Sequence, residues 1–174
     1  MKKILITIAV AVAISILFLS IKAKRIEHPL PGNAVADKIF IEKSKRHLTL
    51  LKSNVPLKTY VVALGRHPDG KKAEEGDGKT PEGTYTIDRR KIKSSYHRAL
   101  HISYPNASDV AQAKLKGVSP GGDIMIHGLP NLVGFVGQFH TIRDWTLGCV
   151  AVTNREIEEI WRAAPDGTLV EIVP

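Results

Sequence analysis

The segment Thr146-Leu147-Gly148-Cys149-Val150-Ala151-Val152 contains the only cysteine of the 174-residue chain. The cysteine follows a glycine and opens a short apolar run that is typical of a strand. A second apolar run upstream, Ile124-Met125-Ile126-His127-Gly128, ends on a histidine. A thiol and an imidazole at the ends of two expected strands are the minimum parts of a nucleophilic cysteine site. The pair therefore indicates catalysis, although a structural cysteine and a structural histidine remain the alternative.

Short apolar runs bounded by turn residues recur along the chain and predict a mainly-β fold rather than a doubly wound α/β fold. The first three expected strands are separated by tight turns, which favours an antiparallel meander. Residues 67–78, 89–95 and 128–137 are expected to be a polar loop, a basic connection and a Gly/Pro-bearing loop. The expected strands are 38–42, 46–51, 57–64, 84–87, 100–104, 124–127, 149–152 and 168–173.

Two short helices complete the expected domain. Residues 108–116 have capping residues at both ends. The second helix follows Thr153 and Glu156, which form a capping box, and its apolar residues recur at helical spacing. We therefore expect one domain over residues 37–174, preceded by a Pro/Gly-containing linker over residues 25–36.

Residues 1–24 have the pattern of an N-terminal signal peptide or membrane anchor. Two lysines precede an apolar run from Ile4 to Ile21. That run is long for a signal peptide and just long enough to span a bilayer. Lysines stand on both sides of it, so the charges do not decide the orientation. If the segment is retained, we expect it to bind the cytoplasmic membrane.

Composition excludes several other functions. The formal net charge is +8, which suits an anionic environment such as a cell wall as well as it suits an ordinary solvated surface. No stripe of Lys and Arg interleaved with aromatic residues indicates a nucleic-acid partner. A lone cysteine cannot form an internal disulfide. Nothing in the sequence calls for a cofactor.

His127 is the best candidate for the base that activates the thiol. The backbone N–H groups of the Leu147-Gly148-Cys149 turn could stabilise a developing oxyanion. His140 is a rival base or a substrate contact. Cys149, His127 and His140 match no zinc-ligand spacing, so no metal site is expected. A papain-type fold is disfavoured, because there the cysteine precedes the histidine and begins a helix.

These segments resemble a known family. His127-Gly128, followed after a loop by Thr146-Leu147-Gly148-Cys149-Val150, is similar to the signature of the L,D-transpeptidase catalytic domain (YkuD-like, also called ErfK/YbiS/YcfS/YnhG). Gly78-Lys79-Thr80-Pro81-Glu82-Gly83-Thr84-Tyr85 is similar to the Thr-Pro-x-Gly turn and strand of that family. The resemblance covers about residues 37–173. It implies a β-sandwich or barrel-like domain.

The resemblance also implies roles for individual residues. Cys149 would be the nucleophile, His127 the base, and Gly128 the source of the carbonyl that orients it. The amides of Gly148 and Cys149 would form the oxyanion hole. Thr146, which occupies the family's Ser/Thr position, and Leu147 would contact the substrate. The implied substrate is a peptidoglycan stem peptide. The implied location is the periplasm or the outer face of the cytoplasmic membrane, with a role in cell-wall organisation and cell shape.

Two departures from the family pattern leave the acyl acceptor open. Many members have His where Leu147 stands and Arg where Ala151 stands, and Arg143 could replace the missing charge near the substrate. The segment around Cys149 instead looks like the YafK-like branch. The alternatives are therefore an amidase that releases a protein, such as a wall-attached lipoprotein, from peptidoglycan, and a non-catalytic wall-binding module.

Overall fold

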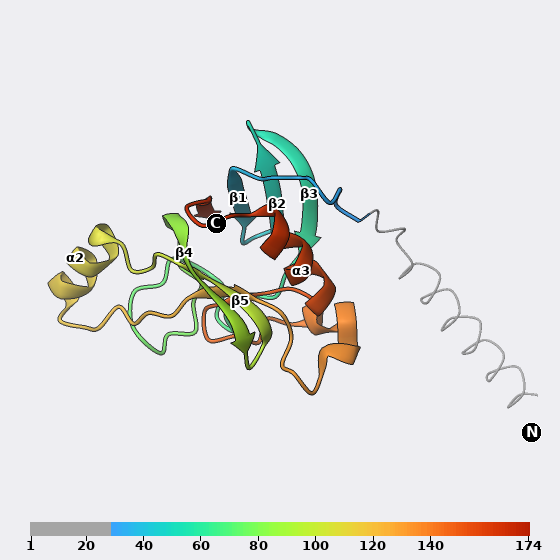
Figure 1. Cartoon of the computed structure of the whole chain (residues 1–174). Coiled ribbons are helices and arrows are strands. Elements are labelled where there is room, and N and C mark those ends of the chain that lie inside the picture. Colours follow the sequence, from blue (N-terminus) through green and yellow to red (C-terminus); the bar gives the residue numbers. More distant parts are fainter. Residues whose placement is uncertain (1–28) are drawn as a thin grey trace, which may run out of the picture.

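The computed structural model describes residues 29–174, which form one eight-stranded sheet and three helices (Figure 1). The strand order is β3-β2-β1-β8-β4-β5-β6-β7. The expected mainly-β fold is confirmed. The strands are β1 Lys38–Glu42, β2 His47–Lys52, β3 Val55–Val61, β4 Gly83–Ser94, β5 His97–Ile102, β6 Met125–His127, β7 Val150–Ala151 and β8 Leu169–Val173; the helices are α2 Ala107–Lys116, the 3-10 helix η1 Gly134–Ile142 and α3 Asn154–Ala163.

The expected signal peptide or anchor at residues 1–24 lies outside the described residues. Within residues 29–174, no helix is both long and apolar enough to cross a membrane. The second half of the expected linker is attached to the domain. Leu30 and Ala36 are buried in the core, and the Ala36 N–H donates to the Ala163 carbonyl across 2.8 Å.

The first three strands form the expected antiparallel meander, in which β2 pairs with both β1 and β3. The closing strand β8 pairs parallel with β1 and antiparallel with β4, so it joins the meander to the rest of the sheet. Buried positions alternate along β1 and β2 as expected of strands with one face on the core. β3 begins and ends earlier than expected, at Val55 and Val61.

The sheet curls so that its two ends meet. Val62 and Leu64 follow β3 and are fully buried. Between them, Ala63 forms a bridge with Ala151 of β7, and Gly65 forms one with Thr146. These bridges connect the β3 end of the strand order to the β7 end, which gives the domain its barrel-like character.

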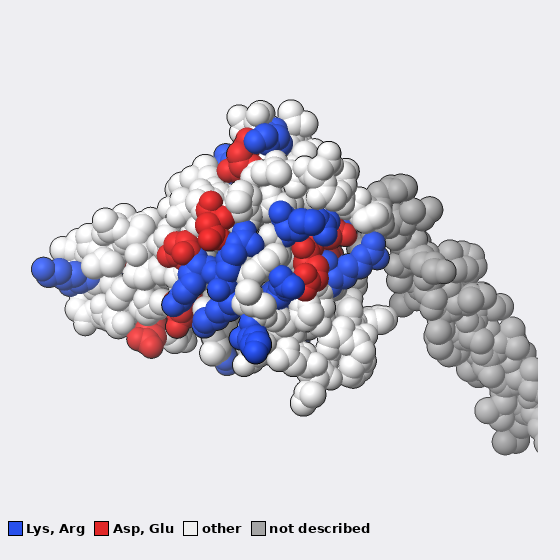
Figure 2. Space-filling model, viewed as in Figure 1, with Lys and Arg blue, Asp and Glu red and all other residues white. Residues whose placement is uncertain are grey.

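The prediction that residues 89–95 form a basic connection is wrong. β4 continues through them to Ser94 and pairs with β5 in a long hairpin. Exposed charged side chains hid the strand, because its tip is held by backbone pairing with β5 and buries little apolar surface. Figure 2 shows Lys and Arg gathering over this hairpin, with Asp and Glu beside them.

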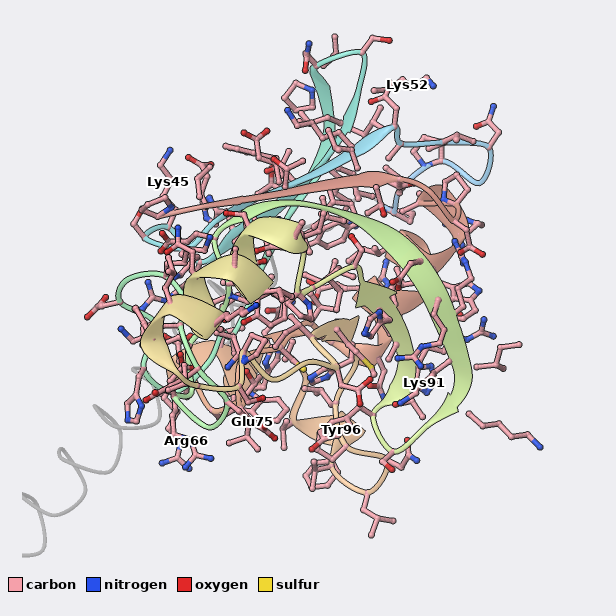
Figure 3. All side chains as sticks on the ribbon, turned by 90° about the vertical axis from the view of Figure 1, so that its left-hand side faces the viewer. Lys45, Lys52, Arg66, Glu75, Lys91 and Tyr96 are labelled. Carbon is pink, nitrogen blue, oxygen red and sulfur yellow. The ribbon has the colours of Figure 1, made fainter. Side chains whose placement is uncertain are left out.

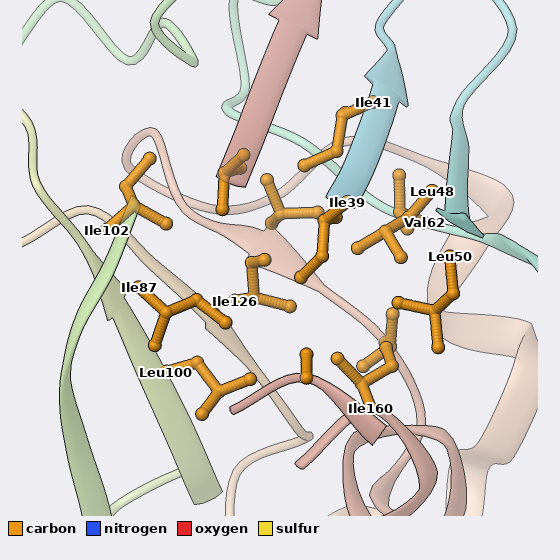
Figure 4. Packing of buried hydrophobic residues seen from close by; sticks show 14 of the residues in the cluster. Ile39, Ile41, Leu48, Leu50, Val62, Ile87, Leu100, Ile102, Ile126 and Ile160 are labelled. Atoms are coloured by element: carbon orange, nitrogen blue, oxygen red, sulfur yellow. The ribbon is translucent and has the colours of Figure 1, made fainter. Parts of the chain in front are cut away.

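The core lies on one face of the β4–β7 half of the sheet. Leu100, Ile126 and Val150 are paired across three strands and are all buried. They pack with the inward residues of the meander and with Ile160 of α3 (Figure 4). The expected capping box of α3 is present: the Thr153 side chain accepts from the Glu156 N–H, and Glu156 accepts from the Thr153 N–H.

The loop expected at residues 128–137 is only partly a loop. Its last residues enter η1, which runs from Gly134 to Ile142 with a kink at Gly137. Short 3-10 turns are poorly marked in sequence, because they lack the long apolar periodicity of an α-helix. In Figure 1, α3 lies between the meander and the β4–β5 hairpin, while α2 extends away from the sheet.

Candidate active site

The turn before β7 holds the cysteine in a fixed backbone geometry. The Thr146 hydroxyl donates to the Cys149 carbonyl across 2.7 Å and accepts from the Gly148 N–H across 3.1 Å. Gly148 has a φ of +134°, a conformation that residues with a β-carbon rarely adopt. The Thr146 side chain thus stabilises the turn by hydrogen-bonding to two of its backbone groups.

Neighbouring segments anchor the same turn. Asp144 accepts from the Leu64 N–H across 2.8 Å and forms an ion pair with Arg46. The Thr146 N–H donates to the Leu64 carbonyl. Because the chain on both sides of Thr146 is tied to the strand end after β3, Cys149 stands on a rigid support.

His127 ends β6 and is nearly completely buried. Its Nδ1 lies 2.6 Å from the Gly128 carbonyl oxygen. A carbonyl oxygen can only accept a hydrogen bond, so Nδ1 carries the proton and Nε2 carries the free lone pair. That is the tautomer a base needs if it is to accept a proton through Nε2.

Two aromatic rings enclose the imidazole. The Tyr96 ring centroid lies 4.5 Å from that of His127, and the Trp145 centroid lies 5.9 Å away in an edge-on arrangement. Burial lowers the pKa of His127, and the hydrogen bond to Gly128 offsets part of that effect. The imidazole is therefore neutral near pH 7 and able to accept a proton.

Cys149 faces the same side of the sheet as His127. Parallel pairing sets His127 opposite Ala151, and Cys149 is two residues before Ala151 on the same face. The thiol donates to the Asp123 carbonyl across 3.7 Å, and within residues 29–174 it has no hydrogen bond to the imidazole. Both side chains line one pocket, and catalytic hydrogen bonds in free enzymes often form only when substrate binds.

The thiol is not ionised at rest. Burial raises its pKa above the ordinary value, and the charge of Asp123 raises it further. The Met125 amide, which hydrogen-bonds to the sulfur, and the charges of Lys72 and Lys91 lower the pKa in part. The free site therefore holds a neutral thiol and a neutral imidazole.

A pocket of about 550 Å³ contains this pair. Cys149, His127, Trp145 and Tyr96 form part of its wall. Lys91 and Lys93 of β4 line it as well, and Figure 3 shows Lys91 on the β4–β5 hairpin whose turn carries Tyr96. The pocket thus combines a nucleophile, a base and two cations.

The other residues singled out in the sequence divide between two pockets. Thr146 and Leu147 line the pocket of Cys149, and Leu147 is largely exposed there. Arg143 and His140 instead line a separate apolar pocket of about 620 Å³ beneath η1. Arg143 is not among the residues that line the pocket of Cys149, whereas Lys91 and Lys93 are. Residues 29–174 contain no group of three His, Cys, Asp or Glu side chains arranged to hold a metal ion.

One of the two expected oxyanion donors is engaged. The Gly148 N–H donates to Thr146, whereas the Cys149 N–H has no partner within residues 29–174. Gly148 is needed for the turn itself, because a β-carbon there would meet the Lys79 carbonyl. In this geometry Cys149 supplies the available backbone donor.

Comparison with known proteins agrees with this arrangement. The family model for the YkuD L,D-transpeptidase catalytic domain matches residues 36–172. The chain belongs to this family. It is 32% identical over 146 residues to a protein of Escherichia coli strain K12 named "Putative L,D-transpeptidase YafK", which covers 80% of this chain and 51% of that protein.

Solved structures of L,D-transpeptidases and related proteins have the same fold. The helical cell shape determining protein Pgp2 of Campylobacter jejuni is 26% identical, with a TM-score of 0.59 over 78% of this chain and 46% of that one. Bd1075 of Bdellovibrio bacteriovorus, at 23% identity and a TM-score of 0.54, covers 84% of this chain and 53% of its own. The chain thus spans about half the length of these relatives.

Sequence reasoning missed several residues of the YkuD-type pocket. Lys91, Lys93 and Tyr96 were hidden because their segment was interpreted as a connection rather than a strand and its turn. The signal was present in the alternation of Arg89, Lys91 and Lys93, which places three cations on one face of a strand. Trp145 belongs to the segment around Cys149 that looks like the YafK-like branch, but no local pattern in the sequence marks it as part of the pocket wall.

Proposed function

We propose that the chain is a cysteine-dependent peptidoglycan L,D-transpeptidase that acts in the periplasm or at the outer face of the cytoplasmic membrane. The observation that carries the proposal is that Cys149, His127 with its Nε2 unprotonated, and a free Cys149 N–H belong to one pocket. Membership of the L,D-transpeptidase family supports the same chemistry. The proposed substrate is a tetrapeptide stem of peptidoglycan.

The first half-reaction forms a thioester. The thiol transfers its proton to Nε2 of His127 as the sulfur attacks the carbonyl carbon of the third, diamino-acid residue of the stem. The Cys149 N–H donates to the resulting oxyanion. The imidazolium then gives its proton to the amine of the terminal D-alanine, which leaves, and the acyl group remains on Cys149.

The pKa directions of the two groups support proton transfer during the attack rather than before it. Because burial holds the thiol pKa high and the His127 pKa low, no thiolate–imidazolium pair accumulates before substrate binds. Proton transfer therefore accompanies attack, unlike in enzymes with a preformed ion pair. Tyr96 and Trp145 hold the imidazole plane in place for that transfer.

The second half-reaction resolves the thioester. An amine, deprotonated by His127, attacks the acyl carbon and displaces the Cys149 sulfur, which regains its proton from the imidazolium. The amine of another stem gives a cross-link, whereas the amine of a protein gives a wall-attached protein. Water in the place of the amine gives hydrolysis. Similarity to YafK, together with Leu147 and Ala151, keeps an amidase that releases a wall-attached protein as the second candidate.

Incubation of the purified chain with tetrapeptide muropeptides separates these activities. Cross-linked dimers and free D-alanine, detected by mass spectrometry, are expected for transfer. Cleavage of protein-linked muropeptides without dimers would support the amidase. Retention of full biological activity by Cys149→Ala, and no acyl adduct with a carbapenem, would leave only a wall-binding module.

A further inference from the structure

Two cations in the Cys149 pocket have no carboxylate partner. Other basic residues of β4 and β5 are paired: Arg89 with Asp123, Arg90 with Asp166, and Arg98 with Glu158. Lys91 and Lys93 form no ion pair within residues 29–174, although both line the pocket. An unpaired surface lysine is common, but two of them on one wall of a reactive pocket are available to an anion that enters it.

The register of the sheet sets where that anion would lie. Lys91 pairs with Ala99, and Ala99 pairs with His127, so the three residues form one row across β4, β5 and β6. Paired residues on neighbouring strands point to the same face. Adjacent strands are about 4.8 Å apart, which puts the backbones of Lys91 and His127 about 10 Å from each other.

Ala99 keeps the space between these two residues open. It is buried, lines the pocket, and has the smallest side chain of the row. The long Lys91 side chain can therefore reach toward the base over Ala99. The charge of Lys91 is felt at the sulfur, where it lowers the thiol pKa.

We propose that Lys91 and Lys93 form a subsite for a carboxylate of the peptide substrate, about one residue from the reacting carbonyl. The inference rests on the proposed function and names a feature of its substrate. A tetrapeptide stem offers three such groups: the free carboxylate of its D-glutamate, a carboxylate on the diamino-acid side chain, and the carboxylate of the terminal D-alanine. All three present the same chemistry to an ammonium group.

The test compares lysine variants on peptides that differ in one charge. The proteins are the full chain, Lys91→Gln, Lys93→Gln, the double variant, and Lys114→Gln on exposed α2 as a control with the same charge change. The substrates are a tetrapeptide with all carboxylates free and three peptides that carry one amide each. The readout is kcat/KM for release of the terminal residue.

We expect the double variant to lose about tenfold to hundredfold in kcat/KM on the free peptide, the size of one or two charge-assisted hydrogen bonds. The kcat/KM of wild type should be lower by a similar factor on one of the three amidated peptides than on the free peptide. On that amidated peptide the lysine variants should have the same kcat/KM as wild type. That peptide identifies the carboxylate. The Lys114→Gln control should match wild type on every peptide.

Two results would overturn the subsite. Equal activity of wild type and double variant on all peptides would show that the lysines face only solvent. Equal loss on every peptide, with a shifted pH profile, would show that they act only on the thiol. If wild type releases no D-alanine, the subsite is tested by calorimetric binding of the free peptide to Cys149→Ala, with and without the lysine changes. Binding that depends on the lysines would uphold the subsite although the proposed function fails. Binding that does not depend on them would reject both.

Discussion

Gly148 lies against the backbone of Lys79 so closely that a β-carbon at position 148 would stand 2.7 Å from the Lys79 carbonyl oxygen. The Gly78–Tyr85 segment, far away in sequence, therefore contacts the turn of the nucleophile through Lys79. Buried Lys43 secures this segment by donating to the Thr80 carbonyl and to Glu82. Two motifs that were separate in the sequence are one structural unit.

Gly148→Ala tests this unit. The substitution adds a β-carbon where φ is +134° and where backbone stands in the way. We expect the free energy of unfolding to fall by more than about 2 kcal/mol and D-alanine release to be lost. Gly167→Ala is the control: Gly167 also has a positive φ, but no atom lies within 4 Å of the added carbon. Urea denaturation should show only about a 1 kcal/mol loss there; equal losses would contradict the contact with Lys79.

The alkylation rate of the cysteine reports whether the thiol is neutral at rest. Cys149 is the only cysteine, so iodoacetamide labelling has one site. Because burial raises its pKa, the rate should increase about tenfold per pH unit from pH 6 to 8. His127→Ala should change the rate at pH 6 by less than about threefold, since no ion pair is lost. A rate that is flat between pH 5 and 8 would instead show a preformed thiolate–imidazolium pair.

Thr146 should act through its hydroxyl rather than through contact with substrate. Thr146→Ser keeps the donor to the Cys149 carbonyl and the acceptor for the Gly148 N–H, so activity should stay within about threefold. Thr146→Val keeps the shape but leaves both backbone groups unpaired, at a cost of about 1–3 kcal/mol in stability. We expect kcat to fall at least tenfold while KM changes little. A selective rise in KM would assign Thr146 to substrate binding.

Local pattern was enough to predict the strands that alternate cleanly and the helices that carry caps. A strand is indicated where every second side chain is apolar and buried, as for Ile39 and Ile41 in β1 and for Leu48 and Leu50 in β2. The distal part of β4 did not follow this rule. Arg90 packs on Trp161 of α3, whereas the other residues from 89 to 93 are exposed, and backbone pairing to β5 determines the conformation of this part of the strand.

The same distinction holds for the site. Cys149 and His127 could be predicted as site residues, because a lone cysteine and a strand-ending histidine, each next to a glycine, indicate a nucleophile and a base without any knowledge of the fold. Lys91, Ala99 and Tyr96 could not, because they reach the pocket only through strand register and hairpin geometry. Arg143 shows the converse: it is close to Cys149 in sequence but lines another pocket.

Tyr96 should position the base without touching the reacting atoms. Tyr96→Leu removes the ring that lies 4.5 Å from the His127 ring and opens the imidazole to water. Since burial is what lowers the pKa of His127, the acid limb of the kcat profile should move toward pH 6.5. We expect kcat to fall about tenfold, and Tyr96→Phe to restore it, because the ring and not the hydroxyl makes the contact. An unchanged pH profile in Tyr96→Leu would exclude the positioning role.

We expect His140 to lower the free energy of unfolding at acid pH and to contribute little to catalysis. Its two ring nitrogens are buried without a hydrogen-bond partner within residues 29–174, and it lies outside the pocket of Cys149. Burial, with a smaller effect from the nearby His127, lowers the pKa of His140 to about 4. In the unfolded chain the group titrates near 6.5, so between pH 6.5 and 4 the unfolded state binds more protons than the folded state. The free energy of unfolding is therefore highest above pH 6.5 and declines by roughly 3 kcal/mol as the pH falls to 4.

His140→Leu removes both the unpaired nitrogens and this proton linkage. We expect the variant to gain about 1–2 kcal/mol at pH 7.5, because no polar group is left unsatisfied. Its advantage over wild type should widen at pH 4.5, as measured by urea denaturation at both values. Both proteins should still lose stability below pH 4, because Asp77 is present in both. Against the opposing effect of burial, hydrogen bonds from Lys72 and from backbone amides lower the pKa of Asp77 to about 2, and they are lost when its carboxylate is protonated. D-Alanine release within about twofold of wild type would assign the base to His127, whereas its abolition in a folded variant would return His140 to the catalytic site.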